Sequence, residues 1–394
     1  MRERAWRRAV ACAAVAACFP AGGCGTGGSD GYRVGFTTDL SGKYALNGVG
    51  QRDGFKAYFD LLNAEGGING RKVEVTYLDD GGEVGRGSAN VARLAASPDT
   101  SAIGGLLVSN GCGAAAPRAT RLRVPLVCSA VADDLLRPVS PYVFAARTSQ
   151  GNQAAPMIRF AGTLVRAAKP RIAIIYFASA ASANLEKNLR ASAQKRGWQV
   201  VADESVPLTA TDVSAQTARI VAAKPDIVVG ALYDPLAILF LRNMAARQVR
   251  VPFVNYDGTT AAGSLLPLKN PDYYGLSNAA MSGDGTGAGV RRFARAMQRN
   301  GKPATTAYAN IGYLQAAEIA EGLRVCGHPC PGAKMRHALE NLRFDSGGFA
   351  SGPVGFSPDD HEGVRAVSFY AWDPRAKALR EVASNVPAGG GPGA

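Results

Sequence analysis

The sequence predicts an α/β fold with two lobes, each a doubly wound parallel sheet covered by helices. The chain has 394 residues, 47% of them apolar, which is enough to bury two cores. Short β-type runs alternate with amphipathic helices from residue 32, and the alternation starts again after residue 153. Near-continuous apolar strands joined by helices are typical of parallel sheets buried on both faces.

The first repeat begins with "YRVGFTTDL", which predicts a strand at 32–40. The next segment, 50–67, places Phe55, Phe59 and Leu62 on one helical face before a Gly-Gly stop. Further strands are expected at 72–80, 101–109 and 124–130, with helices at 87–97 and 113–123.

The second repeat has the same order. We expect helices at 155–168, 182–197, 213–223 and 235–248, and strands at 169–177, 199–206, 224–233 and 251–257. The last third adds helices at 289–301, 305–327 and 332–344 and β-type runs at 352–357 and 367–373. These strands are too few for a third domain, so we expect them to complete the first two lobes.

The N-terminus has the pattern of an export signal. "MRERAWRR" is basic, and the apolar run that follows is too short to span a membrane. The junction "AGGC" resembles the lipobox of bacterial lipoproteins, which implies cleavage before Cys24 and its lipidation. Cys18 in "VAAC" and ordinary secretion remain alternatives. The glycines after Cys24 suit a flexible tether.

The expected organisation follows from these patterns. The segments are a signal peptide at 1–23, the lipidated cysteine and tether at 24–31, lobe 1 at 32–153 plus 279–351, lobe 2 at 154–278 plus 352–386, and a tail at 387–394.

The seven cysteines are distributed among these predicted segments. Two lie in the signal and one would carry lipid, so four remain in an exported chain, which argues for two disulfides. "CGHPC" closes a short turn, so Cys326 is expected to pair with Cys330, leaving Cys112 for Cys128. A metal site that uses His328 is the alternative, but two further ligands are not placed nearby.

Charge and motifs exclude several function classes. The net charge is +13, but basic residues are spread over helix faces, which favours an anionic cell envelope over nucleic acid. The chain has three histidines, and its one G-x-S-x-G lies in the tether. We therefore expect no enzyme activity, no metal and no cofactor.

Two parallel sheets offer a ligand site at the carboxyl ends of their strands. The loops expected there are rich in small hydroxyl and amide side chains, with a carboxylate at Asp257. Such a set can bind both the carboxylate and the ammonium of a zwitterion.

Four stretches resemble the type I periplasmic binding proteins of the branched-chain amino acid transporter family: 40–80, which includes "NAEGGINGRKVEV", and 124–130, 211–229 and 352–360. The resemblance covers about 32–382. It implies a Venus-flytrap fold with three crossovers, whose substrate closes the hinge before delivery to an ABC permease.

The resemblance also implies site residues. The loop from Ser41 to Gly48 keeps the family's shape, Ser109 matches a ligand-contacting serine, and Asp257 matches the acid that binds an ammonium. Ala132 and Ala181 stand where the family has a threonine and a tyrosine, which widens the choice of ligand. The expected ligand-binding set is Ser41, Asn47, Ser109, Asn110, Ala130, Tyr233 and Asp257.

We therefore expect a monomeric, lipid-anchored, extracytoplasmic substrate-binding protein of an ABC importer. Its ligand would be an amino acid, an amide or a related small acid, and its membrane contact would be the lipid alone. A ligand-sensing receptor on the same fold is the alternative, and a permease encoded beside the protein would distinguish the two.

Overall fold

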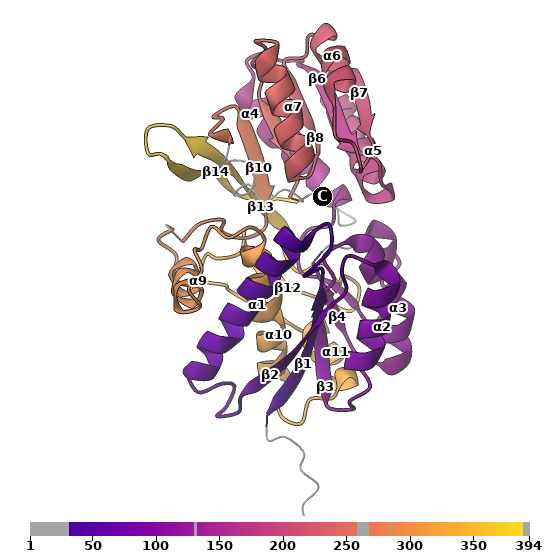
Figure 1. Cartoon of the computed structure of the whole chain (residues 1–394), viewed down its shortest axis with the longest axis vertical. Coiled ribbons are helices and arrows are strands. Elements are labelled where there is room, and N and C mark those ends of the chain that lie inside the picture. The colour runs from indigo at the N-terminus through magenta and orange to yellow at the C-terminus, as the bar shows by residue number, and fades with distance from the viewer. Residues whose placement is uncertain (1–30, 130–131, 258–267, 284, 389–394) are drawn as a thin grey trace, which may run out of the picture. The chain divides into compact units, whose positions relative to one another are not determined.

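The computed structural model describes residues 31–129, 132–257, 268–283 and 285–388. The predicted signal peptide, Cys24 and the end of the tail lie outside these residues, as does Ala130. Residues 31–394 form one compact unit, which contains two main sheets (Figure 1). In the described ranges, no helix has the length and apolarity needed to cross a membrane.

The first sheet has the strand order β2-β1-β3-β4-β5, and all its neighbours are parallel. Its strands are β1 (Tyr32–Thr38), β2 (Val73–Asp79), β3 (Thr100–Gly105), β4 (Leu126–Cys128) and β5 (Val143–Ala145). The helices connected to it are α1 (Ala45–Ala64), α2 (Val84–Leu94), α3 (Ser109–Leu122), α9 (Ala288–Arg299), α10 (Ala309–Cys326) and α11 (Gly332–Glu340).

Both faces of this sheet are covered, as its apolar strands require. Helices α1, α10 and α11 pack on one face and α2 and α3 on the other (Figure 1). A series of buried hydrogen bonds links α1 and α10 to the strands. The Thr38 hydroxyl donates to the side-chain oxygen of Gln51, and the Gln51 amide donates to that of Gln315. The Gln315 amide donates to the Val127 carbonyl, and each distance is 2.7 Å. These bonds satisfy the buried amides and fix both helices to the strands.

The second sheet has the order β14-β13-β10-β9-β8-β6-β7. Its strands are β6 (Arg171–Phe177), β7 (Gln199–Val206), β8 (Ile227–Ala231), β9 (Phe253–Asn255), β10 (Tyr273–Ser277), β13 (Ala366–Asp373) and β14 (Ala378–Pro387). Its helices are α4 (Ala154–Leu164), α5 (Ala180–Lys195), α6 (Ser214–Ala222) and α7 (Asp234–Ala246).

Alternation along β6 shows why this sheet also needs two helical layers. Ile172 and Ile174 pack with α4 and α5, whereas Ala173 and Ile175 pack with α6 and α7. Successive side chains of a strand point to opposite faces, so a wholly apolar strand is buried on both. The predicted α/β fold with parallel sheets is confirmed.

Three strands of the main sheets were not expected from the sequence: β5, β10 and β14. Strand β13 runs antiparallel to both β10 and β14, so the second sheet has an antiparallel edge. A separate two-stranded sheet pairs β11 (Arg343–Phe344) with β12 (Val354–Gly355). The predicted lobe boundaries remain a prediction.

The disulfides join Cys112 to Cys128 and Cys326 to Cys330, the pairing expected from the sequence. The second bridge corrects the alternative of a metal site at "CGHPC", because both thiols are used in it. His328 instead packs edge-on against Tyr32, with 5.4 Å between the ring centres.

The chain passes between the two sheets three times: after β5, after β10 and before β13. The three segments are hydrogen-bonded to one another at Thr148 and Asn278. Thr148 donates to the Val364 carbonyl at 2.7 Å, and Asn278 donates to Thr148 and to the Ala366 carbonyl at 2.8 Å. The connections therefore form one bonded unit where the sheets meet.

Glu362 lies in the third of these segments and is buried. Its carboxylate accepts hydrogen bonds from the Ser149 N–H at 3.0 Å and the Asn152 amide at 2.7 Å, and forms an ion pair with Arg137 at 3.2 Å. Burial nevertheless raises the pKa of Glu362 to about 7, because desolvation of the charged form outweighs Arg137.

We predict that Glu362→Gln removes a pH dependence of stability. The folded-state pKa is higher than in the unfolded chain, so Glu362 costs stability as the pH rises from about 4.5 to 7. The variant should gain at most about 3 kcal/mol in unfolding free energy over the parent protein between pH 4.5 and 8. Denaturant unfolding across this range measures the difference. The exposed Glu74→Gln is the control, and equal slopes for both variants would contradict the prediction.

Candidate ligand-binding site

A cavity of about 220 Å³ lies at the carboxyl ends of parallel strands from both sheets. Its walls include the segments that follow β1, β2, β3 and β5 in the first sheet and β6, β7, β8 and β9 in the second. This is the place where open α/β sheets bind ligands. A larger cavity, of about 700 Å³, lies beside β14 and the 343–354 segment, away from these strand ends.

The loop after β1 is held close to the cavity by Asp39. Its carboxylate accepts the N–H groups of Gly42 at 2.5 Å and Tyr44 at 2.8 Å. A Cβ atom at Gly48 would lie 1.8 Å from the Asp39 carbonyl oxygen, so only glycine allows α1 to begin so near the loop. Asp39 therefore fixes the loop that leads into α1.

Five helices begin at the cavity. The residues that immediately precede α1, α3, α5, α7 and α10 all line it: Tyr44, Val108, Ser179, Tyr233 and Tyr308. Among these described helix starts, only that of α5 has a side-chain cap, where Ser179 accepts the Ser182 N–H at 3.1 Å. The positive ends of five helix dipoles thus surround one small volume.

Aromatic side chains form much of the wall: Tyr44, Phe177, Tyr233, Tyr256 and Tyr308. Phe177 lies 6.0 Å from Tyr233, nearly perpendicular to it, and 5.9 Å from Tyr256, measured between ring centres. The Tyr233 hydroxyl donates to the Leu208 carbonyl at 2.7 Å, which fixes its ring. The wall is therefore rigid and presents ring faces and edges.

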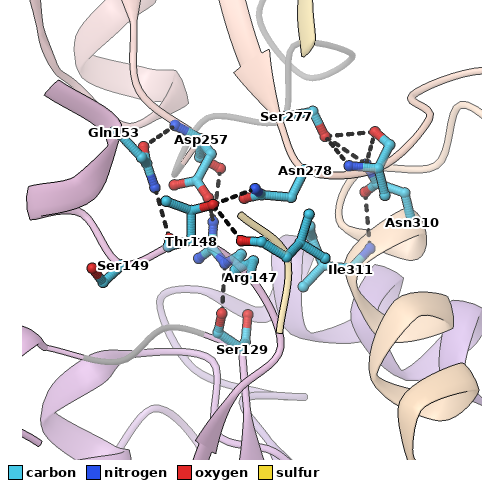
Figure 2. Close-up of polar contacts among 12 residues, drawn as sticks. Ser129, Arg147, Thr148, Ser149, Gln153, Asp257, Ser277, Asn278, Asn310 and Ile311 are labelled. Atoms are coloured by element: carbon cyan, nitrogen blue, oxygen red, sulfur yellow. Dashed lines mark hydrogen bonds and ion pairs between the residues drawn. The ribbon is translucent and has the colours of Figure 1, made fainter. Parts of the chain in front are cut away.

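A buried ion pair lies at the back of the cavity (Figure 2). The Arg147 Nη1 atom is 2.5 Å from Asp257 Oδ2, and the two side chains are 6% and 2% exposed. Arg147 also donates from Nε to the Ser129 carbonyl at 2.5 Å and from Nη1 to the Asp257 carbonyl at 3.1 Å. Figure 2 shows Gln153 on the other side, where its amide oxygen accepts the Asp257 N–H at 3.2 Å.

Burial and the ion pair together shift the pKa values of Arg147 and the two neighbouring phenols. Burial lowers the pKa of Arg147, but the charge of Asp257 and the Tyr308 phenol outweigh it, so the net shift is upward. Burial raises the pKa of the Tyr256 and Tyr308 phenols, and Arg147 lowers both only in part. At neutral pH the guanidinium is charged and both phenols are neutral donors.

The structure brings four of the predicted residues to the cavity: Asn47, Ser109, Asn110 and Tyr233. Ala181 lines it as well.

Ser41 and Asp257 are not among the described residues that line the cavity. The Ser41 hydroxyl donates to Asp79 at 2.5 Å. Asp257 lies behind Arg147, where it forms the ion pair, and its predicted role toward a ligand ammonium stays a prediction. Ala130 lies outside the described residues.

Sequence reasoning missed Arg147, Phe177, Tyr256 and Tyr308. The one available signal was Arg147 itself, a lone charge that follows the apolar run "VFAA". Lys43, at the rim, was also not singled out. No group of three or more metal-ligating side chains occurs in the part of the chain that the structure describes.

The model of the periplasmic binding protein family matches residues 31–378. The chain belongs to this family. Among its relatives, the "Leu/Ile/Val-binding protein homolog 7" of Brucella abortus is 24% identical over 346 residues, 84% of this chain and 85% of that protein. The "Leu/Ile/Val-binding protein BraC3" of Rhizobium johnstonii is 25% identical over 261 residues, 64% of this chain and 65% of that protein.

Solved structures share the periplasmic binding protein fold. The LivJ protein of Streptococcus pneumoniae, solved with isoleucine, has a TM-score of 0.75 at 20% identity, covering 90% of this chain and 99% of that one. A solute-binding protein of R. palustris, solved with 4-hydroxybenzoate, has a TM-score of 0.77 at 19% identity, covering 91% and 98%. At such identities the likeness shows the fold.

We predict that Asp257→Asn is more destabilising than Arg147→Gln combined with Asp257→Asn. The single change leaves a buried guanidinium without its carboxylate, which costs about 3 to 5 kcal/mol, whereas the double change removes both charges. Thermal and denaturant unfolding of the two variants measure the difference. A double variant as unstable as the single one would show that the charge pairing matters little.

Proposed function

We propose that this periplasmic binding protein is the extracytoplasmic substrate-binding protein of an ABC importer. It captures a small amino-acid-like solute, an amide or a related small acid and delivers it to a permease. The observation that carries the proposal is the cavity, which takes its walls from the loops of both sheets. The names of the relatives support it, because they are amino-acid-binding proteins.

Capture of a solute follows from the fact that each sheet supplies part of the cavity wall. Asn47, Ser109 and Asn110 come from the first sheet, and Tyr233 comes from the second. A solute that contacts both sets of residues stabilises the arrangement in which they are close. The three connecting segments are the covalent links between the sheets, so a movement that brings the two sets of residues together would bend these segments. Ser41, Ala130 and Asp257 remain candidate contacts.

The lining of the cavity supports binding better than it supports a serine nucleophile activated by histidine. Ser109 is the predicted serine that lines it, and no histidine is among the described lining residues. His361 is buried elsewhere, stacked on Phe144 with 4.0 Å between ring centres. A serine without a base is a weak nucleophile.

A binding screen tests the function. The full-length protein, purified in detergent and dialysed, is heated with amino acids, amides and small carboxylic acids in turn. A solute present at about 100 times its Kd should raise the unfolding free energy by about 2.7 kcal/mol and be recovered chemically unchanged. Denatured protein is the control for non-specific binding. If no solute stabilises the protein, or if the solute is converted, the proposal fails.

We further propose that Cys24 carries a lipid that holds the protein at the outer face of the cell membrane. Mass spectrometry of the mature N-terminus should show an acylated Cys24, and Cys24→Ser should release the protein from membranes. Cys18→Ser is the matched control and should leave the anchor intact. An unmodified N-terminus in the parent protein would contradict this.

A further inference from the structure

We infer that the cavity selects a small aromatic carboxylate that carries no ammonium group. This inference rests on the proposed function and narrows its ligand. Three features of the cavity support it: the sign of its charges, the position of its hydrogen-bond donors and the composition of its wall.

The charges favour an anion. Lys43 and Arg147 line the cavity, and no aspartate or glutamate is among the described residues that do so. The starts of five helices add partial positive charge. Asp257 offsets much of the Arg147 charge, so Lys43 and the helix starts supply most of the preference for a carboxylate over an ammonium.

Asp234 and Asp257 both interact with the Tyr256 and Tyr308 phenols. Asp234 is not among the described residues that line the cavity, and Asp257 already forms an ion pair with Arg147. Its Oδ2 atom lies 2.5 Å from Arg147, and its side chain is 2% exposed. To bind an ammonium it would have to leave a buried guanidinium uncompensated, which is unfavourable. Among the described side chains that line the cavity, a zwitterion thus finds cations for its carboxylate and no acid for its ammonium.

The donors for a carboxylate lie at the start of α3. No acceptor among the described residues pairs with the backbone N–H of Ser109 or Asn110, and α3 has no side-chain cap. Both residues line the cavity, as does the Arg147 guanidinium. Uncapped N–H groups together with a helix dipole are a common way to bind a carboxylate.

The wall favours an aromatic ring. Five aromatic side chains line the cavity, and Phe177 already makes ring contacts with Tyr233 and Tyr256. A further ring can pack offset or edge-on against them, which adds to the hydrophobic contribution. The small volume of about 220 Å³ favours a single ring.

Calorimetry with matched probes tests each feature separately on the full-length protein. Benzoate should bind at least about tenfold more tightly than benzamide, which lacks the charge, a difference of about 1.4 kcal/mol. 4-Methylpentanoate should bind at least about tenfold more tightly than L-leucine, which differs from it by the ammonium. Benzoate should also bind about threefold or more tightly than cyclohexanecarboxylate.

The outcomes separate the two proposals. Tighter binding of leucine than of 4-methylpentanoate, or equal binding of benzoate and benzamide, overturns this inference and leaves the importer function standing. Equal binding of benzoate and cyclohexanecarboxylate overturns its aromatic part. If neither these acids nor any amino acid or amide binds, both proposals fail.

Variants check that binding occurs in this cavity. Arg147→Gln with Asp257→Asn removes the cation without leaving a buried charge, and should weaken benzoate binding about tenfold or more but benzamide binding little. Lys43→Gln should weaken benzoate binding by a few-fold, while Lys269→Gln, an exposed lysine packed on Trp372, should have no effect. Loss of benzoate binding in Lys269→Gln, or unchanged binding in the double variant with a normal melting temperature, contradicts the assignment.

Discussion

The pairing of Arg147 with Asp257 is the constraint on which the site depends. A guanidinium can be buried only if a carboxylate and further acceptors satisfy it. Here the partners are Asp257, at the end of β9, and the Ser129 carbonyl, after β4. Arg147 belongs to the first connection between the sheets, so this one requirement ties that connection to strands of both sheets and places a cation at the back of the cavity.

Much of the fold was predictable because its information is local. Strands such as β6, apolar on both faces, and helices such as α1 show their period directly in the sequence. The strands that were missed lack that signal. β5 has three residues inside what read as a junction, and most side chains of β14 are exposed. Such strands are defined by the neighbours they pair with, as β14 is by β13.

Part of the site was predictable from one rule, that parallel sheets bind ligands at the carboxyl ends of their strands. Ser109, Asn110 and Tyr233 directly follow strands, so parallel pairing alone brings them to one edge. Arg147 and Asp257 are 110 residues apart, and their contact depends on how the connecting segments bond to one another. The sequence therefore indicated that Asp257 was important, and its contact with a ligand ammonium stays a prediction, but nothing in the sequence indicated its ion pair with Arg147.

The helix starts around the cavity limit what a substitution can change in this site. Their N–H groups belong to the main chain, and the side chain of the residue that precedes α1, α3, α7 or α10 accepts none of them. Among single substitutions, only a change to proline removes a main-chain N–H group. The attraction of the helix starts for negative charge therefore depends on the fold more than on the side chains. A substitution at a wall residue such as Ala181 would therefore change the shape of the cavity and leave these main-chain donors in place.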